Sequence, residues 1–430
     1  MQHSFKRLKF ACYTTNVTMS MVCNLSPLLF ITFRNLYGIS YTLLGLLVVI
    51  NFFTQLLVDL AFSFFSHKFN IEKSVKYTPV IAIVGFAIFG CAPWIFPNAV
   101  YLGLVLGTVI FSAASGLAEV LISPVIAAIP AENPDKEMSK LHSIYAWGVV
   151  GVVILATLYL LFVGSAYWQY LVFASLAIPL VAAILYCRVE LPQMQTPERV
   201  SGALALCKNK ALWGCVLAIF LGGASECTMA QWSSGYLEKA LGISKVWGDI
   251  FGVALFGVTL GLGRTLYAKF GKNIRKVLLC CAIGAVGCYL VAALSPFPVV
   301  GLIACGLTGF CTSMMWPGSL IVAADRFPKG GVFMYAMMAA GGDLGASVGP
   351  QLVGVVTDTA IASKTLQNLA ETLSLAPEQL GMKLGMLVGM IFPLAAIIVF
   401  TVILKCDKKP EALPLSGSEL PNDTDIKKDA

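Results

Sequence analysis

Twelve apolar stretches recur along this chain, and each is long enough to cross a lipid bilayer. They lie at residues 10–33, 41–66, 75–96, 99–129, 138–163, 166–188, 211–236, 246–268, 274–294, 297–324, 330–357 and 383–405. A spanning helix needs about 20 such residues, and lipid offers the backbone no hydrogen-bond partner outside the segment itself. The sequence therefore predicts an all-α membrane protein with twelve transmembrane helices.

The composition leaves little room for anything else. Of the 430 residues, 58% are hydrophobic and only 12% are charged, whereas a soluble domain carries about 25% charged residues. A polar segment with Pro192 and Pro197 separates two sets of six stretches. We expect four parts: an N-terminal six-helix bundle (1–189), a cytoplasmic linker (190–210), a C-terminal six-helix bundle (211–405) and a cytoplasmic tail (406–430).

Corresponding turns in the two halves resemble each other, as pseudo-symmetric parallel repeats would. The first stretch is followed by Tyr-Gly-Ile-Ser at 37–40, and the seventh by Leu-Gly-Ile-Ser at 241–244. One insertion interrupts the repeat, at residues 358–382. Its leucines at 366, 369 and 373, followed by Pro377, predict a short amphipathic helix and then a second helical turn at the outer face.

The distribution of Lys and Arg predicts the orientation, since cytoplasmic loops carry the excess. With the N-terminus inside, the cytoplasmic segments hold 23 of these residues and the outer loops hold 5. We therefore expect a multi-pass protein of the bacterial cytoplasmic (inner) membrane with both termini in the cytoplasm. The net charge of +7 is scattered over short loops, so no nucleic-acid partner is expected.

Cysteine usage and loop composition indicate neither a metal centre nor an enzyme. The 13 cysteines lie almost entirely within apolar stretches, and no Cys-x-x-Cys pair occurs, so we expect small apolar fillers and no disulfide framework or metal site. The loops contain no paired nucleophile and base. We expect no cofactor.

Five ionisable residues lie inside stretches that are otherwise apolar: Asp59, Glu119, Glu226, Arg264 and Asp343. Each charge at the bilayer centre costs roughly 2.5 to 3.5 kcal/mol on insertion scales unless it faces a partner or a wet cavity. Intramembrane ionisable residues mark ion and substrate pathways. Their presence predicts transport.

The twelve spans in two similar halves, with basic inner loops after the second and eighth, resemble the major facilitator superfamily. Within it, the chain resembles sugar:proton symporters of the fucose and galactose type, which carry a carboxylate in the fourth helix, here Glu119 in Ser-Gly-Leu-Ala-Glu at 115–119. Those porters also use a carboxylate in the first helix, where this chain has only Asn16 and Asn24. The family's Gly and Asp signature is replaced at residues 63–70.

The resemblance implies roles for the buried charges. Glu119 and Glu226 fall in helices that line the central cavity, where burial disfavours the charged carboxylate and allows proton exchange near neutral pH; a permanently paired carboxylate is the alternative. Asp59, Arg264 and Asp343 are assigned to gating. Asp59 is expected to face the start of the eleventh helix and Arg264 to pair with Glu137 or Glu132, while Asp343 serves either as hinge support or in ion coupling.

The substrate-binding residues are expected among deep polar and aromatic side chains: Asn24, His142, Trp147, Glu226, Gln231 and Trp232. An indole packs against the CH face of a sugar while amides and carboxylates bind its hydroxyls; packing between helices is the alternative for Trp147 and Trp232. Asn16, Ser20 and Asn24 form a stripe on one face of the first helix. This stripe either binds substrate or joins helices.

These observations predict a secondary active transporter that works by alternating access. We expect it to be a monomer that moves a small polar organic solute, a sugar or sugar derivative, with a proton gradient as the driving force. Two alternatives keep the same fold. One is a proton-driven exporter of hydrophobic compounds, and the other is a membrane sensor that moves no solute.

Overall fold

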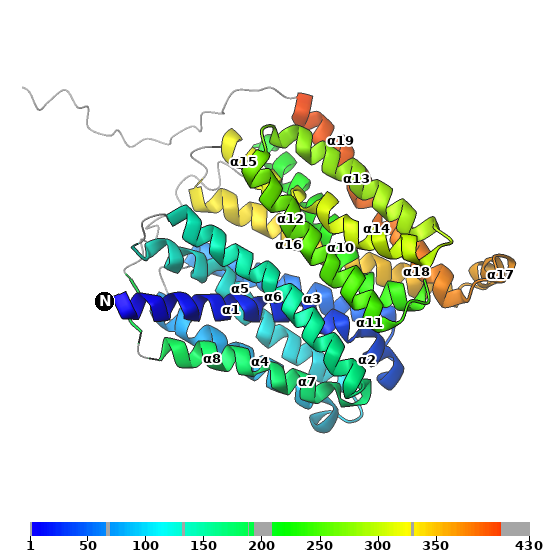
Figure 1. Ribbon diagram of the computed structural model, residues 1–430, viewed down its shortest axis with the longest axis horizontal. Coiled ribbons are helices and arrows are strands. Elements are labelled where there is room, and N and C mark those ends of the chain that lie inside the picture. Colours follow the sequence, from blue (N-terminus) through cyan, green and yellow to red (C-terminus); the bar gives the residue numbers. More distant parts are fainter. Residues whose placement is uncertain are drawn as a thin grey trace, which may run out of the picture.

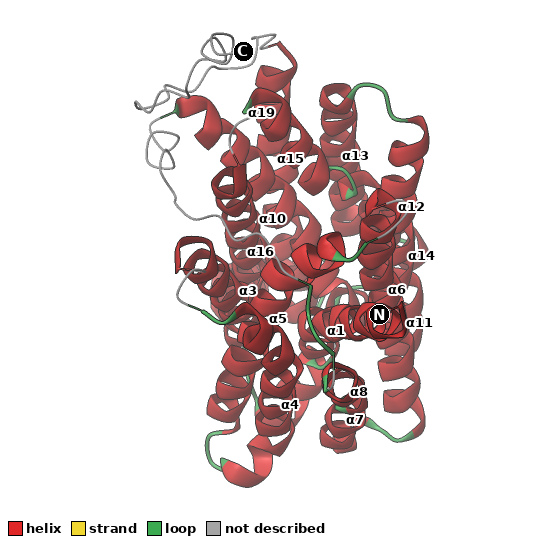
Figure 2. Cartoon of the chain, turned by 90° about the vertical axis from the view of Figure 1, so that its left-hand side faces the viewer, coloured by secondary structure: helices red, strands yellow, loops and turns green. Residues whose placement is uncertain are grey.

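The structure is a computed structural model that describes residues 2–65, 69–130, 134–187, 189–192, 209–327 and 331–405. Within these ranges the regular elements are helices, and no strand occurs. Most of them run roughly along the long axis of the molecule (Figure 1), joined by short loops (Figure 2). Helices suit a bilayer because each satisfies its own backbone hydrogen bonds.

The first half of the chain forms the lower bundle in Figure 1. Its elements are α1 (Gln2–Leu28), α2 (Phe30–Tyr37), α3 (Tyr41–Phe65), α4 (Ile71–Ile95), α5 (Val100–Ala128), α6 (Pro134–Phe162), η2 (Ser165–Tyr167), α7 (Trp168–Ser175) and α8 (Ala177–Tyr186). Together α1 and α2 are long and apolar enough for one span, and the angle between them is 44°. Pro27 precedes the break, and a proline inside a helix removes one backbone hydrogen bond.

The second half forms the upper bundle of Figure 1. Its elements are α10 (Lys210–Lys239), α11 (Lys245–Gly248), η3 (Asp249–Ala254), α12 (Leu255–Phe270), α13 (Ile274–Leu294), α14 (Pro298–Thr312), α15 (Met315–Arg326), α16 (Gly331–Ala362), α17 (Lys364–Thr372), α18 (Pro377–Gly389) and α19 (Ile391–Lys405). The π-helix η3 joins α11 to α12 in one span.

The predicted all-α membrane fold is confirmed. Among the described residues, ten helical segments are long and apolar enough to cross a bilayer, and the bent pair of α1 and α2 makes eleven. The remaining predicted span corresponds to α16, whose 32 residues reach about 48 Å at 1.5 Å per residue. The predicted linker falls largely on residues 193–208 and the tail on 406–430, which lie outside the described residues.

The insertion at 358–382 contains the predicted short helix, α17. Leu369 and Leu373 are exposed on it. The second turn predicted at Pro377 is not a separate element, because Pro377 opens α18, which leads into the last span through α19. Proline suits the first helical position, and the Gln379 side chain accepts a hydrogen bond from the Ala376 N–H at 3.0 Å. The last helical stretch therefore begins at Pro377, earlier than the predicted residue 383.

Aromatic packing joins the two halves near the α17 end of the molecule. Trp232 of α10 is 1% exposed, and its ring centroid lies 5.4 Å from that of Phe30 and 5.7 Å from that of Tyr41. The indole N–H donates to the Pro350 carbonyl at 2.8 Å. This apolar contact with a satisfied polar group stabilises the interface.

Polar contacts join the halves at the same end. Both carboxylate oxygens of Asp358, near the end of α16, accept from the start of α3: Oδ1 from the Tyr41 N–H at 3.2 Å and Oδ2 from the Thr42 N–H at 2.7 Å. Glu378 accepts from the Tyr41 hydroxyl at 2.6 Å and from Arg34 Nε at 3.2 Å. The first N–H groups of a helix have no partner within the helix, so Asp358 caps α3 from the opposite half.

We expect Asp358→Ala to destabilise the protein by about 1 to 2 kcal/mol, the usual effect of losing a helix cap. The Tyr41 and Thr42 N–H groups lose their acceptors in this variant, whereas Asp358→Asn keeps one side-chain acceptor. Thermal unfolding of the purified protein in detergent measures the effect. Glu371→Ala on α17 is the control, because its side chain is exposed. Equal unfolding midpoints for Asp358→Ala and wild type would contradict the assigned cap.

Candidate functional site

A line of buried polar side chains runs along α3, at Asn51, Gln55 and Asp59. Residues four apart lie on one face of a helix, and this face packs against α5. The Ser112 hydroxyl of α5 donates to Asn51 Oδ1 at 2.6 Å. One turn further on, Gly116 lets α5 approach closely, since a Cβ there would lie 3.0 Å from the Gln55 carbonyl oxygen. The polar line thus leads between α3 and α5 to Asp59.

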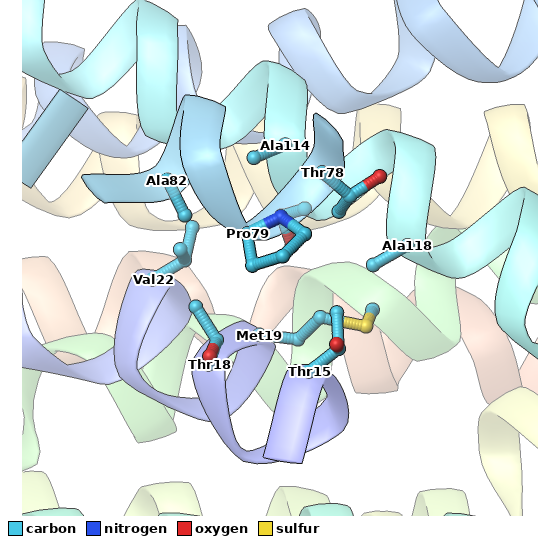
Figure 3. Close-up of a pocket in the computed structure, with 10 residues that line it drawn as sticks. Thr15, Thr18, Met19, Val22, Thr78, Pro79, Ala82, Ala114 and Ala118 are labelled. Carbon is cyan, nitrogen blue, oxygen red and sulfur yellow. The ribbon is translucent and has the colours of Figure 1, made fainter. Parts of the chain in front are cut away.

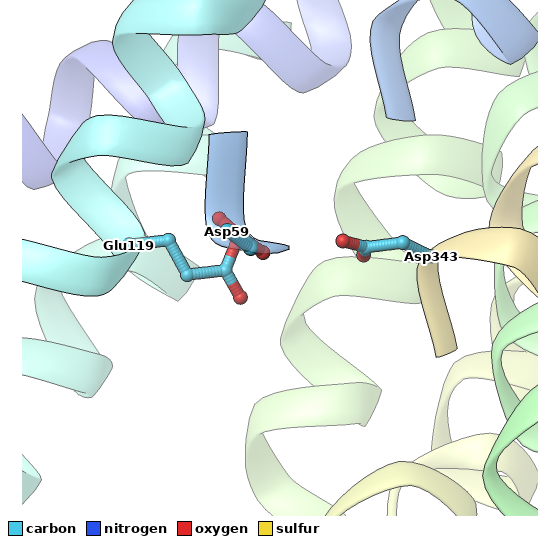
Figure 4. A group of neighbouring side chains, drawn as sticks. All are labelled: Asp59, Glu119 and Asp343. Carbon is cyan, nitrogen blue, oxygen red and sulfur yellow. The ribbon is translucent and has the colours of Figure 1, made fainter. Parts of the chain in front are cut away.

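Three carboxylates meet at the end of this line. Asp59 of α3, Glu119 of α5 and Asp343 of α16 each bring a carboxylate oxygen to within 4.8 Å of the other two. Figure 4 shows Asp343 extending from the second half toward Asp59 and Glu119 of the first half. We call these three residues the carboxylate cluster. It lies at the interface of the two halves.

The members of the cluster differ in exposure. Asp59 and Asp343 are each 4% exposed, and Asp59 Oδ1 and Asp343 Oδ2 have no hydrogen-bond partner among the residues that the structure describes. Glu119 is exposed, although it shares a face of α5 with Ser112 and Ser115, which are buried. The exposed leucines Leu102 and Leu106 lie on another face of α5, so the exposure of Glu119 points to space within the protein, through which the cluster is accessible.

The electrostatics of the cluster favour bound positive charge. Two unit charges 4.8 Å apart repel by about 3.5 kcal/mol at an effective dielectric constant of about 20, and three ionised carboxylates form three such pairs. The arrangement is suited to binding protons or a cation at the interface.

Glu226 and Arg264 form a separate pair within the second half. Arg264 Nη2 lies 3.4 Å from both oxygens of Glu226, and Arg264 Nε donates to the Ser313 carbonyl at 3.2 Å. The Glu226 side chain is only 15% exposed. Of the partners expected for Arg264, Glu132 lies outside the described residues and the side chain of Glu137 is not described. The structure thus pairs Arg264, which was expected to act in gating, with Glu226, which was expected to exchange protons.

Asp59 also differs from its expected placement. The sequence places it opposite the start of the eleventh helix, where a helix dipole would favour an anion. In the structure Asp59 meets Asp343, which lies in the interior of α16 and not in its first turn. Asp59 therefore lies beside a carboxylate in the interior of α16, and the expected contact with the start of that helix is corrected.

Three of the side chains expected to bind sugar are engaged in contacts within the protein. Trp232 lies in the packed interface near the α17 end, and Gln231 is 5% exposed, with its Nε2 donating to the Cys23 carbonyl at 3.3 Å. Glu226 is occupied by Arg264. Packing between helices, the alternative stated for Trp232, describes its contacts in this structure.

Trp147 lies on the outward face of α6. Its side chain is 69% exposed, and the exposed Leu155, Leu158 and Phe162 follow it at helical spacing. The opposite side of α6 faces α12, because Val149 and Val150 lie nearest to Gly257. Trp147 therefore points toward the bilayer, which corrects its expected position in a sugar site. The apolar residues that share a face of α6 with Trp147 could have predicted this outward position from the sequence.

The polar stripe of α1 joins helices at two of its positions. The Asn16 amide donates to the Leu141 carbonyl of α6 at 2.6 Å, and the Ser20 hydroxyl donates to the Tyr145 carbonyl at 2.8 Å. Asn24 donates to the Ser20 carbonyl within its own helix and stays partly exposed. His142 lies on α6, but its side chain is not described. Asn24 and His142 thus remain predictions as substrate contacts.

The structure contains small internal pockets. One lies within the first half (Figure 3), between α1, α4 and α5, where Thr15, Thr18 and Thr78 supply polar groups. Another lies between the halves and is lined in part by Asn51 and Gln231. Each has a volume of about 10 Å³, which is close to the minimum for one water molecule. Neither holds a solute of sugar size in this conformation.

Asn51, Gln55 and Ser112 were not identified from the sequence as functional residues. Asn51, Gln55 and Asp59 are spaced at i, i+4 and i+8 in an otherwise apolar stretch. In lipid such a polar face must turn inward, so this spacing would have identified them. Their partner helices follow only from the tertiary structure.

We expect Arg264→Gln to destabilise the protein by about 1 to 3 kcal/mol, because Glu226 loses the partner that offsets its burial. The double variant Arg264→Gln with Glu226→Gln should recover most of this loss, since it also removes the unpaired charge. The midpoints of thermal unfolding of the two purified variants in detergent test the pair. A double variant no more stable than Arg264→Gln would show that the ion pair does not hold this region.

Comparison with known proteins places the chain by fold. No curated protein matches it by sequence. Among solved structures, it is similar to a D-xylose-proton symporter (15% identity, 94% of this chain and 97% of that chain, TM-score 0.69) and to the nucleoside transporter NupG (12%, 94% and 100%, 0.68). It is also similar to the Escherichia coli fucose:proton symporter FucP (18%, 91% and 98%, 0.56).

At these identities the solved structures show a shared fold and not a shared substrate. The sequence comparison goes further, because the description of the Major Facilitator Superfamily matches residues 10–350. That match spans most of the chain and includes the three carboxylates and the ion pair described above. The chain therefore belongs to the major facilitator superfamily, and it is a multi-pass membrane protein of the transporter class.

Proposed function

We propose that this chain is a secondary active transporter that moves a small polar organic solute by alternating access and couples that movement to protons. The carboxylate cluster is the observation that carries the proposal. It combines two acidic residues of the first half with one of the second half, so its charge bears directly on how closely the halves approach. Coupling requires that an ion bias two arrangements of the protein.

In this proposal Glu119 is the residue that exchanges protons with the aqueous space. It is the exposed member of the cluster, whereas Asp59 and Asp343 are buried. A proton on Glu119 removes its repulsion of Asp343 across the interface, so less charge opposes the approach of the two halves. Asp59 and Asp343 act as the gate. Glu226 is held by Arg264, and its place is at the solute.

A sugar or sugar derivative is the proposed substrate class. Two of the similar structures carry titles that name them as fucose:proton and D-xylose-proton symporters. The polar residues Asn24, His142 and Glu226 are the proposed solute contacts, and Trp147 and Trp232 are not among them. The exporter of hydrophobic compounds has less support, because its cavity would be mainly aliphatic with Glu119 isolated, whereas Glu119 lies beside two other carboxylates.

The proposed setting is the cytoplasmic membrane of a bacterium, with the protein a monomer and both termini inside. The excess of Lys and Arg in alternate loops supports this orientation. The contacts described at the α17 end then close the outer face. The cluster lies on the route to the cytoplasm.

We expect Glu119→Gln to reduce proton-driven uptake about tenfold, because the amide cannot carry the coupling proton and coupling between two ligands typically amounts to about 5- to 150-fold. The probes are labelled D-xylose, L-fucose and uridine in proteoliposomes with an imposed pH gradient. Exchange of the same solute across the membrane without a gradient should persist, because it does not require net proton movement.

Glu371→Gln is the matched control. It removes an exposed carboxylate from α17, a helix that contributes no residue to the cluster. Unchanged proton-driven uptake in Glu119→Gln would refute the coupling. Uptake of uridine with neither sugar transported would refute the substrate class. Specific binding without exchange of any probe would favour the sensor.

A further inference from the structure

We propose that the carboxylate cluster is a binding site for a hard divalent cation of the size of Ca²⁺. The ligands are Asp59 and Glu119 from the first half and Asp343 from the second half. Carboxylate oxygens are ligands that Ca²⁺ takes readily. The sequence indicated no metal site, because its three ligands lie on separate helices, without the short spacing that marks a metal motif.

The geometry fits an ion of this size. Three oxygens that lie within 4.8 Å of one another can all lie within about 2.8 Å of one central point. Ca²⁺ binds oxygen at about 2.3 to 2.6 Å, whereas Mg²⁺ requires about 2.0 to 2.1 Å and near-ideal octahedral geometry. A small inward movement of the three side chains would bring their oxygens to Ca²⁺–oxygen distances, whereas Mg²⁺ would require a larger movement.

The burial of two ligands is the second observation. Asp59 and Asp343 are each 4% exposed, and one oxygen of each has no hydrogen-bond partner within the described part of the chain. Buried charges in proteins are paired or coordinate metals. Figure 4 shows the Asp343 carboxylate directed toward the space where Asp59 and Glu119 lie. These unpartnered oxygens point to a positively charged ligand between them.

The charge of the site favours two positive charges over one. Three carboxylates contribute up to three negative charges, and Arg264, the basic residue expected in the membrane core, is paired with Glu226. A divalent ion leaves one negative charge when all three carboxylates are ionised. Ca²⁺ takes six to eight oxygen ligands that include water, and the exposed side at Glu119 admits water.

A bound ion would link the two halves. Asp59 and Glu119 belong to one bundle and Asp343 to the other, so the ion stabilises the arrangement in which these residues are close. It also competes with protons, because Glu119 serves both. Glu119 has a role both in the proposed proton coupling and in the proposed ion site, but the ion can bind whether or not a solute is transported.

The test uses the purified full-length chain in detergent at pH 7.5. Equilibrium dialysis with labelled Ca²⁺ should show saturable binding of one ion per chain, and CaCl₂ should raise the thermal unfolding midpoint relative to choline chloride at equal ionic strength. We expect Asp59→Asn and Asp343→Asn each to weaken Ca²⁺ binding about tenfold or more. Glu371→Gln should bind as wild type does. Asp343→Glu, which keeps the carboxylate, should retain binding and shows that loss in Asp343→Asn is not misfolding.

Three results would overturn the inference: no saturable Ca²⁺ binding by wild type at millimolar concentration, equal binding by wild type and Asp343→Asn, or stabilisation by NaCl with none by CaCl₂. The proposed function is judged separately. If Glu119→Gln loses proton-driven uptake but the wild type binds no Ca²⁺, only the cation site is refuted. If the wild type binds Ca²⁺ but Glu119→Gln keeps its proton-driven uptake, only the proton coupling is refuted.

Discussion

The absence of hydrogen-bond partners in the bilayer core is the constraint on which this structure depends. Every polar side chain in a span must find its partner inside the protein or face water. Asn16 and Ser20 meet this requirement on the backbone of α6, and Asn51 meets it on Ser112 of α5. Asp59 and Asp343 meet it only in part. At the carboxylate cluster this requirement is left partly unsatisfied by two carboxylates from opposite halves.

The interface between the halves combines two kinds of contact. Near the α17 end, Trp232 packs against Phe30 and Tyr41, and Asp358 caps the start of α3; these contacts are satisfied and hold without any bound ion. At the carboxylate cluster the halves meet through groups of like charge, so their approach depends on what is bound. A protein that alternates between two arrangements needs this difference, because a ligand shifts an equilibrium only by binding one state more strongly.

Much of the fold could be predicted from the sequence, and less of the site. The spans and the helix at α17 follow from apolar length and periodicity, which act locally. The sequence also identified each buried charge, since a charge in an apolar stretch is costly wherever it lies. It did not predict, however, that Arg264 pairs with Glu226 or that Glu119 lies beside Asp59 and Asp343.

The sequence by itself determined that this protein is a bundle of membrane-spanning helices with charges it must bury, because hydrophobic length and the cost of a buried charge are properties of each segment. Only the tertiary structure decided which charges meet. Asp59, Glu119 and Asp343 lie on three different helices, and the rotation and crossing of those helices depend on close approaches such as Gly116 to Gln55. The same packing turned Trp147 outward and Trp232 into the interface, because a side chain's surroundings depend on the neighbouring helices as well as its own.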